Sequence, residues 1–137
     1  MTTTTRLPQI VIRAADEDRL AALANSLLDS KPELAEELLG ELARARLASG
    51  DALPPDTVQM GSTLTYEADG RRRTVTLVYP ADADIDAGRV SVATPIGAAL
   101  IGLAEGQSID WTARDGRQHR LTVLAVERPA TGPGRAA

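Results

Sequence analysis

Cysteine and phenylalanine are absent from this chain of 137 residues, and histidine and tryptophan each occur only once. The lack of cysteine excludes disulfides, thiol catalysis and thiolate metal sites, and it fits a protein of the reducing cytoplasm. With two tyrosines as the only other aromatic residues, the chain is poorly supplied for a base-stacking platform or a deep ligand pocket. The core must therefore be built from leucine, valine, isoleucine and alanine.

Long apolar runs and a surplus of positive charge are also lacking. No stretch reaches the length of a membrane span, and the threonine-rich start lacks the basic and then apolar plan of a signal peptide. We therefore expect a cytoplasmic protein that does not bind membranes. A net charge of −4 argues against direct, sequence-specific binding of nucleic acid. The length allows one ordinary domain, or a small domain with an appendage.

Residues for catalysis or metal binding are equally scarce. His119 follows a predicted hairpin turn without a serine or carboxylate at motif spacing, so it is interpreted as an exposed strand residue. Gly97 and Gly102 lack the spacing of a phosphate-binding loop, and no set of zinc ligands is present. The run Arg71-Arg72-Arg73 is interpreted as a set of exposed side chains on a hairpin that protect the edge of the sheet. The alternative is an electrostatic contact with an acidic partner. We predict no catalytic residue, no metal and no cofactor.

The first part of the chain has the apolar spacing of helices. One helix is predicted from Asp16, as its N-cap, to Leu28. Ser30 and Glu33 form a capping box for a second helix, which Ser49-Gly50 ends. Because the connection is short, the two helices are predicted to be antiparallel and to lean on the domain that follows them.

The later part alternates apolar and polar residues with the period of strands. Prolines at 54–55 make a stiff connector before it. Asp69-Gly70 and Asp115-Gly116 are predicted hairpin turns, and Thr94 caps a short helix that starts at Pro95. Strands are predicted at residues 58–60, 63–67, 73–79, 90–93, 109–111 and 118–127, the last of them buried on both faces.

These patterns predict an α+β fold in three parts. Residues 1–52 form an antiparallel α-hairpin arm, and residues 53–128 form an antiparallel β-sheet domain with one short helix. Residues 129–137 form a disordered tail. Because no catalytic group is apparent, the chain is interpreted as a binding module.

One segment resembles a known family. Residues 91–106 read S-V-A-T-P-I-G-A-A-L-I-G-L-A-E-G, with T-L-V-Y-P before them and I-D-W after them. This resembles the C-terminal domain of the Gre transcription factor family, and within it the Rnk branch. The resemblance extends upstream through Met60-Gly61-Ser62 and the Leu53-Pro54-Pro55-Asp56 connector. It implies an FKBP-like fold for the second domain and a short coiled coil for the arm.

The same resemblance implies RNA polymerase as the partner. In Gre-type factors the C-terminal domain docks at the rim of the polymerase secondary channel, and the arm projects inward. The docking segment of that family ends in Ser-Pro, which corresponds here to Thr94 and Pro95. Together with Ile96, and with Ala93 where Gre factors often carry Asp or Asn, these positions form the predicted contact.

Gre factors cleave transcripts with two acidic residues that hold a metal ion at the tip of a long arm. Here the tip offers Asp29 and Glu33, but the tip motif of the family is absent and the predicted arm is only about 25 Å long. Both residues are therefore interpreted as helix-terminus charges. The prediction is a monomeric, non-enzymatic regulator that competes with other channel-binding factors. A Gre-like cleavage factor, a prolyl-isomerase-like peptide binder and a scaffold that pairs through its arm stay open as alternatives.

Overall fold

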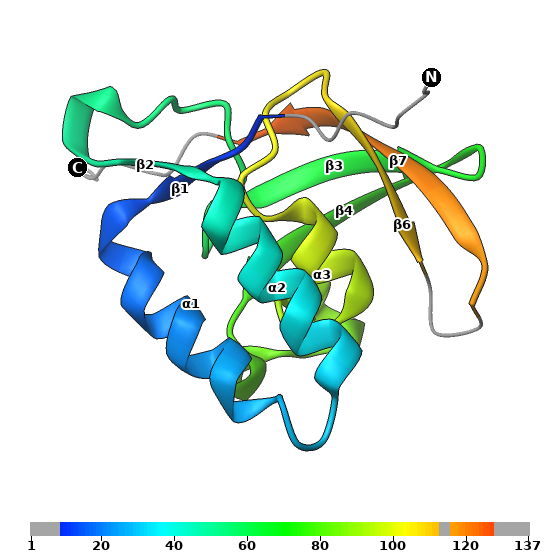
Figure 1. Cartoon of the computed structure of the whole chain (residues 1–137). Helices are drawn as coiled ribbons and strands as arrows, with labels where there is room; N and C mark the ends of the chain where they lie inside the picture. The colour runs from blue at the N-terminus through cyan, green and yellow to red at the C-terminus, as the bar shows by residue number, and fades with distance from the viewer. Residues whose placement is uncertain (1–8, 113–115, 128–137) are drawn as a thin grey trace, which may run out of the picture.

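The computed structural model describes residues 9–112 and 116–127, and it confirms an α+β fold (Figure 1). In these ranges three α-helices pack together against a five-stranded sheet. The helices are α1 (Ala14–Ser26), α2 (Pro32–Arg44) and α3 (Pro95–Leu100). The strands are β1 (Val11–Arg13), β2 (Arg46–Ala48), β3 (Thr63–Ala68), β4 (Arg71–Val78), β5 (Arg89–Ser91), β6 (Ser108–Thr112) and β7 (Gln118–Val126). No helix of the described ranges has the length and apolar character that a membrane span needs.

Helices α1 and α2 run in opposite directions and are joined by residues 27–31 (Figure 1). The prediction that Asp16 is the N-cap of the first helix is wrong. Arg13 occupies the N-cap position because β1 leads directly into α1, and no side chain caps the helix. Asp16 lies within the first turn, where its carboxylate accepts a hydrogen bond from the Arg13 guanidinium at 3.2 Å.

Helix α2 is shorter than predicted. Its N-cap, Lys31, makes no side-chain cap bond, so the predicted capping box of Ser30 and Glu33 is wrong. The helix also ends well before Ser49-Gly50, because residues 46–48 leave it to form β2, which pairs in parallel with β1. Residues 46–48, which helical periodicity assigns to the last turn of α2, instead form hydrogen bonds with β1.

The sheet is mixed, whereas the sequence predicted an antiparallel one. Its strand order is β5-β4-β3-β7-β6, and β4 and β5 form the one parallel pair in it. This direction arises because residues 79–88 carry the chain back to the level of Thr76 before β5 begins. The predicted strand at residues 58–60 is also wrong, since no strand forms there and the isolated bridge to Ala104 lies at Thr57, just before this segment. The FKBP-like designation stays a prediction.

Two further expectations concern turns and strand burial. Asp69 and Gly70 have positive φ angles of 55° and 77°, as a primed hairpin turn requires, so the first predicted turn is confirmed. Asp115 of the second turn lies outside the described residues, as does the predicted tail at 129–137.

The prediction that the last strand is buried on both faces is wrong, because Leu124 is 38% exposed. The β3–β7 register shifts at that residue, which leaves it without a cross-strand partner.

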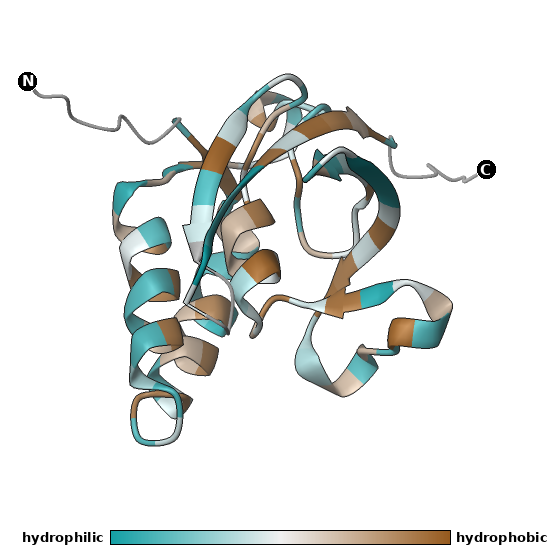
Figure 2. Cartoon of the chain, turned by 90° about the vertical axis from the view of Figure 1, so that its right-hand side faces the viewer, coloured by the Kyte–Doolittle hydropathy of each residue, from teal (hydrophilic) through white to brown (hydrophobic). Residues whose placement is uncertain are grey.

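The helices and the sheet share one hydrophobic core. Leu20 of α1 and Leu38 of α2 are fully buried in the same cluster as Leu100 of α3 and Leu121 of β7. Figure 2 shows hydrophilic residues on the outer sides of the helices and hydrophobic residues on the sides that face the sheet. The short helical pair therefore gains its stability by packing on the sheet.

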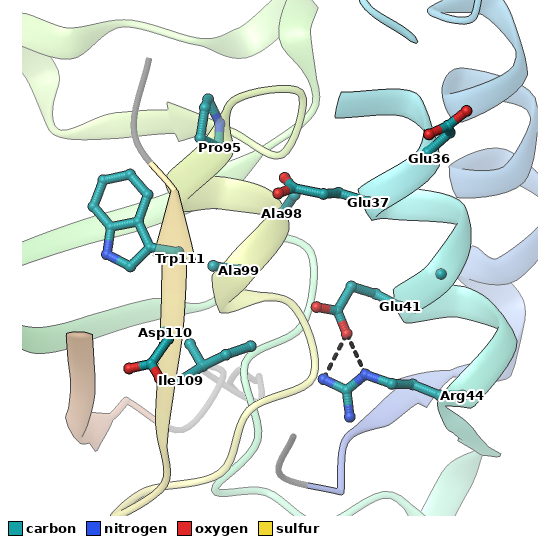
Figure 3. Close-up of a pocket in the computed structure, with 11 residues that line it drawn as sticks. Glu36, Glu37, Glu41, Arg44, Pro95, Ala98, Ala99, Ile109, Asp110 and Trp111 are labelled. Atoms are coloured by element: carbon teal, nitrogen blue, oxygen red, sulfur yellow. Dashed lines mark hydrogen bonds and ion pairs between the residues drawn. The ribbon is translucent and has the colours of Figure 1, made fainter. Parts of the chain in front are cut away.

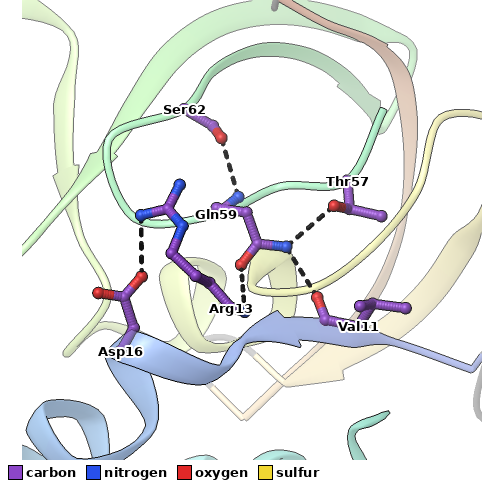
Figure 4. Close-up of polar contacts among 6 residues, drawn as sticks. All are labelled: Val11, Arg13, Asp16, Thr57, Gln59 and Ser62. Carbon is purple, nitrogen blue, oxygen red and sulfur yellow. Dashed lines mark hydrogen bonds and ion pairs between the residues drawn. The ribbon is translucent and has the colours of Figure 1, made fainter. Parts of the chain in front are cut away.

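Gln59 joins the start of the chain to the sheet domain (Figure 4). Its side chain is 3% exposed, and its Oε1 accepts a hydrogen bond from the backbone N–H of Arg13 at 2.8 Å. Its Nε2 donates to the carbonyl oxygen of Val11 at 2.8 Å and to the hydroxyl of Thr57 at 2.9 Å. The hydroxyl of Ser62 accepts from the Gln59 backbone N–H at 2.8 Å. One buried amide therefore ties both ends of β1 to the segment that precedes β3.

Gly97 allows α3 to lie very close to the strand before it. A Cβ atom at this position would overlap the carbonyl oxygen of Ser91 and lie 2.8 Å from the Cα of Val92. Both are backbone atoms, which cannot rotate away as a side chain can. Gly40 of α2 is the opposite case, because a Cβ there would meet nothing within 4 Å.

Replacing Gly97 by alanine should lower the free energy of unfolding by about 1–3 kcal/mol, the usual cost of overpacking a filled interior. Urea unfolding followed by circular dichroism measures this. The matched control is Gly40→Ala, which should raise the free energy of unfolding by about 0.5–1 kcal/mol through helix propensity. Equal stability of the two variants would contradict the close approach of α3 to β5.

Replacing Gln59 by leucine keeps the bulk of the side chain but leaves two buried backbone groups of β1 without partners. Such groups cost about 1–3 kcal/mol each, so the variant should lose about 2–5 kcal/mol of unfolding free energy. The β1 amides should also exchange faster with deuterium. Gln118→Leu, at an exposed position of β7, should change stability by less than about 0.5 kcal/mol. Unchanged exchange in β1 of the Gln59 variant would refute this role of the amide.

Candidate functional site

The turn from β5 into α3 is held by three side-chain hydrogen bonds. The hydroxyl of Thr94 donates to the carbonyl oxygen of Ser91 at 2.7 Å and accepts from the N–H of Gly97 at 3.1 Å. The predicted N-cap is thus confirmed. The hydroxyl of Ser91 accepts from the N–H of Ala93 at 2.9 Å. Pro95 takes the first helical position, where its fixed φ suits the start of a helix.

Residues 93–96, which we call the β5–α3 corner, are the contact with polymerase predicted from the sequence. The structure brings them together but exposes them unequally. Ala93 is 7% exposed, so its side chain is not available to a partner. Thr94, Pro95 and Ile96 are half-buried, and Ile96 also packs against the core. A partner that docks here would therefore meet mainly Thr94 and Pro95.

A groove of about 320 Å³ opens beside Pro95, between α2, α3 and β6, and we call it the α2–α3 groove (Figure 3). One wall is the charged face of α2, and the other is the apolar surface of α3 and β6. The residues that line it are Glu36, Glu37, Gly40, Glu41, Arg44, Pro95, Ala98, Ala99, Ile109, Asp110 and Trp111. The sequence did not reveal this groove, because its walls lie far apart along the chain. The one available signal was Gly40, an isolated glycine inside a predicted helix, which often has a packing or functional reason.

The α2 wall of the groove carries two carboxyl groups whose pKa is raised, one of them the exposed Glu37 and the other the half-buried Glu41. Burial, and then the charge of Glu33, raises the pKa of the Glu37 carboxyl. Burial likewise raises the pKa of Glu41, against the opposing effect of Arg44. The Arg44 Nε donates to Glu41 Oε1 at 2.6 Å, so this carboxylate already has a cation beside it.

His119 has a partner that the sequence did not reveal. Its Nδ1 lies 2.8 Å from Oδ2 of Asp69 in the β3–β4 turn, and its ring centroid lies 5.2 Å from that of Trp111. His119 lies in β7 as predicted but is half-buried, so the prediction that it is exposed is wrong; its carboxylate partner comes from a distant turn and not from a motif spacing. Because β3 pairs with β7, the turn after β3 lies beside the start of β7, and the two residues link the two hairpins.

The predicted arm-tip residues lie at the connection between α1 and α2. Asp29 is in the turn and Glu33 is in the first turn of α2, and both are exposed. Within the described residues, no three histidine, cysteine, aspartate or glutamate side chains gather as metal ligands. The run Arg71-Arg72-Arg73 is exposed on the part of β4 that does not pair with β5, and Arg72 lies 3.9 Å from Glu67.

Comparison with known proteins places two family models on this chain. Residues 8–47 match the Rnk N-terminus, and residues 53–128 match the C-terminal part of the transcription elongation factor GreA/GreB. The second match spans the segment whose motifs resemble the Gre family.

Individual relatives agree with these matches. The regulator of nucleoside diphosphate kinase of Escherichia coli K12 is 37% identical over 122 residues, which is 88% of this chain and 90% of that protein. The transcription elongation factor GreA of Rhodospirillum rubrum is 40% identical over 92 residues, 65% of this chain and 59% of GreA. A solved structure titled as a prokaryotic transcription elongation factor GreA/GreB, from Nitrosomonas europaea, superposes with a TM-score of 0.69 and 35% identity. That match covers 88% of this chain and 98% of the other. This chain therefore belongs to the GreA/GreB transcription elongation factor family, in its Rnk branch.

Proposed function

We propose that this chain is a Rnk-type transcription regulator that binds RNA polymerase at the rim of the secondary channel. It docks through the β5–α3 corner, competes there with Gre-type factors and does not stimulate transcript cleavage. It works as a cytoplasmic monomer and does not read nucleic-acid sequence. The observation that carries the proposal is the preordered, half-exposed Thr94-Pro95 corner in a domain that matches the GreA/GreB C-terminal part.

The fixed conformation of the β5–α3 corner supports a role in docking. A surface that is already fixed loses little conformational freedom when a partner binds. The Thr94 hydroxyl donates a hydrogen bond to the carbonyl oxygen of Ser91 and accepts one from the N–H of Gly97. Its single donor is therefore already used and is not free for a partner. The contact is therefore expected to depend on the shape and apolar surface of Pro95.

The dimensions of the arm support competition without cleavage. Helix α2 has 13 residues, which corresponds to about 20 Å and is shorter than the sequence predicted. Asp29 lies in the connecting turn, whereas Glu33 lies in the first turn of α2, where negative charge suits the helix dipole. A metal site for cleavage would need both carboxylates delivered to one point.

The name of the E. coli relative refers to nucleoside diphosphate kinase. A factor that binds polymerase would exert such control through transcription of the kinase gene. It would need no contact with the kinase itself.

A Gre-like cleavage factor is the second candidate. It is favoured by one observation, the exposure of both Asp29 and Glu33 near the tip of the helical pair. Exposed carboxylates at this place could enter a partner's active centre if the arm reached it.

Replacing Pro95 by glutamate should weaken binding to core RNA polymerase by at least about tenfold, because it puts a charge into an apolar contact. Glutamate in the first turn of a helix is compatible with the fold. The matched control is Ala15→Glu, which adds the same charge to the exposed first turn of α1 and should bind as the wild type does. Fluorescence anisotropy of the labelled chain measures the affinity, and an unlabelled Gre factor should displace it. Wild-type affinity of the Pro95 variant would overturn the corner as the docking surface.

Backtracked elongation complexes separate the two candidate functions. With this protein alone we expect no release of short RNA, because the arm is too short to bring Asp29 and Glu33 to the polymerase metal. Added together with a Gre factor, it should reduce the release that the Gre factor causes. Short RNA that appears with the wild type and disappears with the Asp29→Asn, Glu33→Gln double variant would instead establish a cleavage factor.

A further inference from the structure

The α2–α3 groove combines an apolar wall with an acidic wall. Its floor is formed by Ala98 and Ala99 of α3 and Ile109 of β6, which are almost fully buried. Its accessible apolar surface is that of Pro95 and Trp111, which are half-buried. Because the two alanine side chains are short, there is room above this floor for an apolar side chain from elsewhere. A groove of about 320 Å³ is at the lower end of the range for specific binding pockets.

The acidic wall directs one carboxylate into this space. In Figure 3 the side chain of Glu37 points from α2 toward Ala98, whereas Glu36 points away from α3. The Arg44 side chain bonds to Glu41 at the other end of the wall. Both influences on the Glu37 pKa, burial and the charge of Glu33, disfavour its carboxylate form. Glu37 is exposed, so a cation placed beside it would form an ion pair that is accessible to solvent.

We propose that the α2–α3 groove binds a protein segment that presents an apolar side chain next to a lysine or arginine. The apolar side chain packs on Pro95 and Trp111, the half-buried apolar residues of the lining, and the basic group pairs with Glu37. Charge complementarity decides the chemistry of this occupant, since an acidic segment would meet repulsion from the α2 wall.

The groove is continuous with the β5–α3 corner, because Pro95 lines both. The inference thus rests on the proposed function, and RNA polymerase supplies the segment. The two walls come from different parts of the chain, one from the helical pair and the other from the sheet domain. A segment bound between them would hold α2 against α3 and thereby fix the direction of the arm on the polymerase.

Gly40 offers a direct test, because it lines the groove and a Cβ atom there meets nothing within 4 Å. Gly40→Leu should place an apolar side chain in the groove and should stabilise α2 through helix propensity. We expect it to lower the affinity for core RNA polymerase at least about tenfold, as Glu37→Lys should, while urea unfolding shows no loss of stability. Gly40→Ala is the size control, and Asp18→Asn on the exposed surface of α1 is the charge control. Both controls should stay within about twofold of the wild type.

The outcomes distinguish the groove from the proposed function. If wild-type protein fails to bind polymerase, the proposed function fails, and the inference fails with it. If the wild type binds and Pro95→Glu does not, but Gly40→Leu and Glu37→Lys bind normally, the corner stands and the groove is refuted. Sedimentation tests whether a second copy of this chain occupies the groove. A wild-type dimer that Gly40→Leu dissociates would assign the groove to that second copy and overturn the proposal.

Discussion

The buried amide of Gln59 is the contact on which the arrangement of this molecule depends. It satisfies two backbone groups of β1 and the hydroxyl of Thr57 in an environment with almost no solvent access. Strand β1 leads without a break into α1, and it also pairs with β2, which follows α2. Both helices of the arm are therefore anchored at one end, to the same three-residue strand. A buried polar group without a partner at this place would destabilise the attachment of both helices to the sheet domain.

That anchor explains why the candidate site lies at a junction. Because β1 and β2 hold the ends of α1 and α2 next to the sheet, the charged side of α2 lies along the groove that separates it from α3 and β6. The β5–α3 corner lies at one edge of that groove through Pro95. The proposed docking surface thus borders α2, one of the two helices of the arm.

Local signals in the sequence were reliable in some places and not in others. The Thr94-Pro95 cap and the Asp69-Gly70 turn depend on neighbouring residues, and both were predicted correctly. The capping box at Ser30 and Glu33 was wrong, because Lys31 takes the N-cap position and no side chain bonds there. The end of α2 was wrong for a different reason: its last predicted turn is used for pairing with β1, and helical periodicity cannot report a competing strand.

The sequence by itself determined the α+β class, the apolar faces of the helices, the corner at Thr94 and Pro95, and the family to which the chain belongs. These depend on periodicity, on caps and turns, and on a motif of consecutive residues. Only the tertiary structure decided the parallel pairing of β5 with β4, the Gln59 anchor, the contact of His119 with Asp69 and the groove between α2 and α3. Each of these joins residues that are distant along the chain, and packing in three dimensions alone sets how close they come.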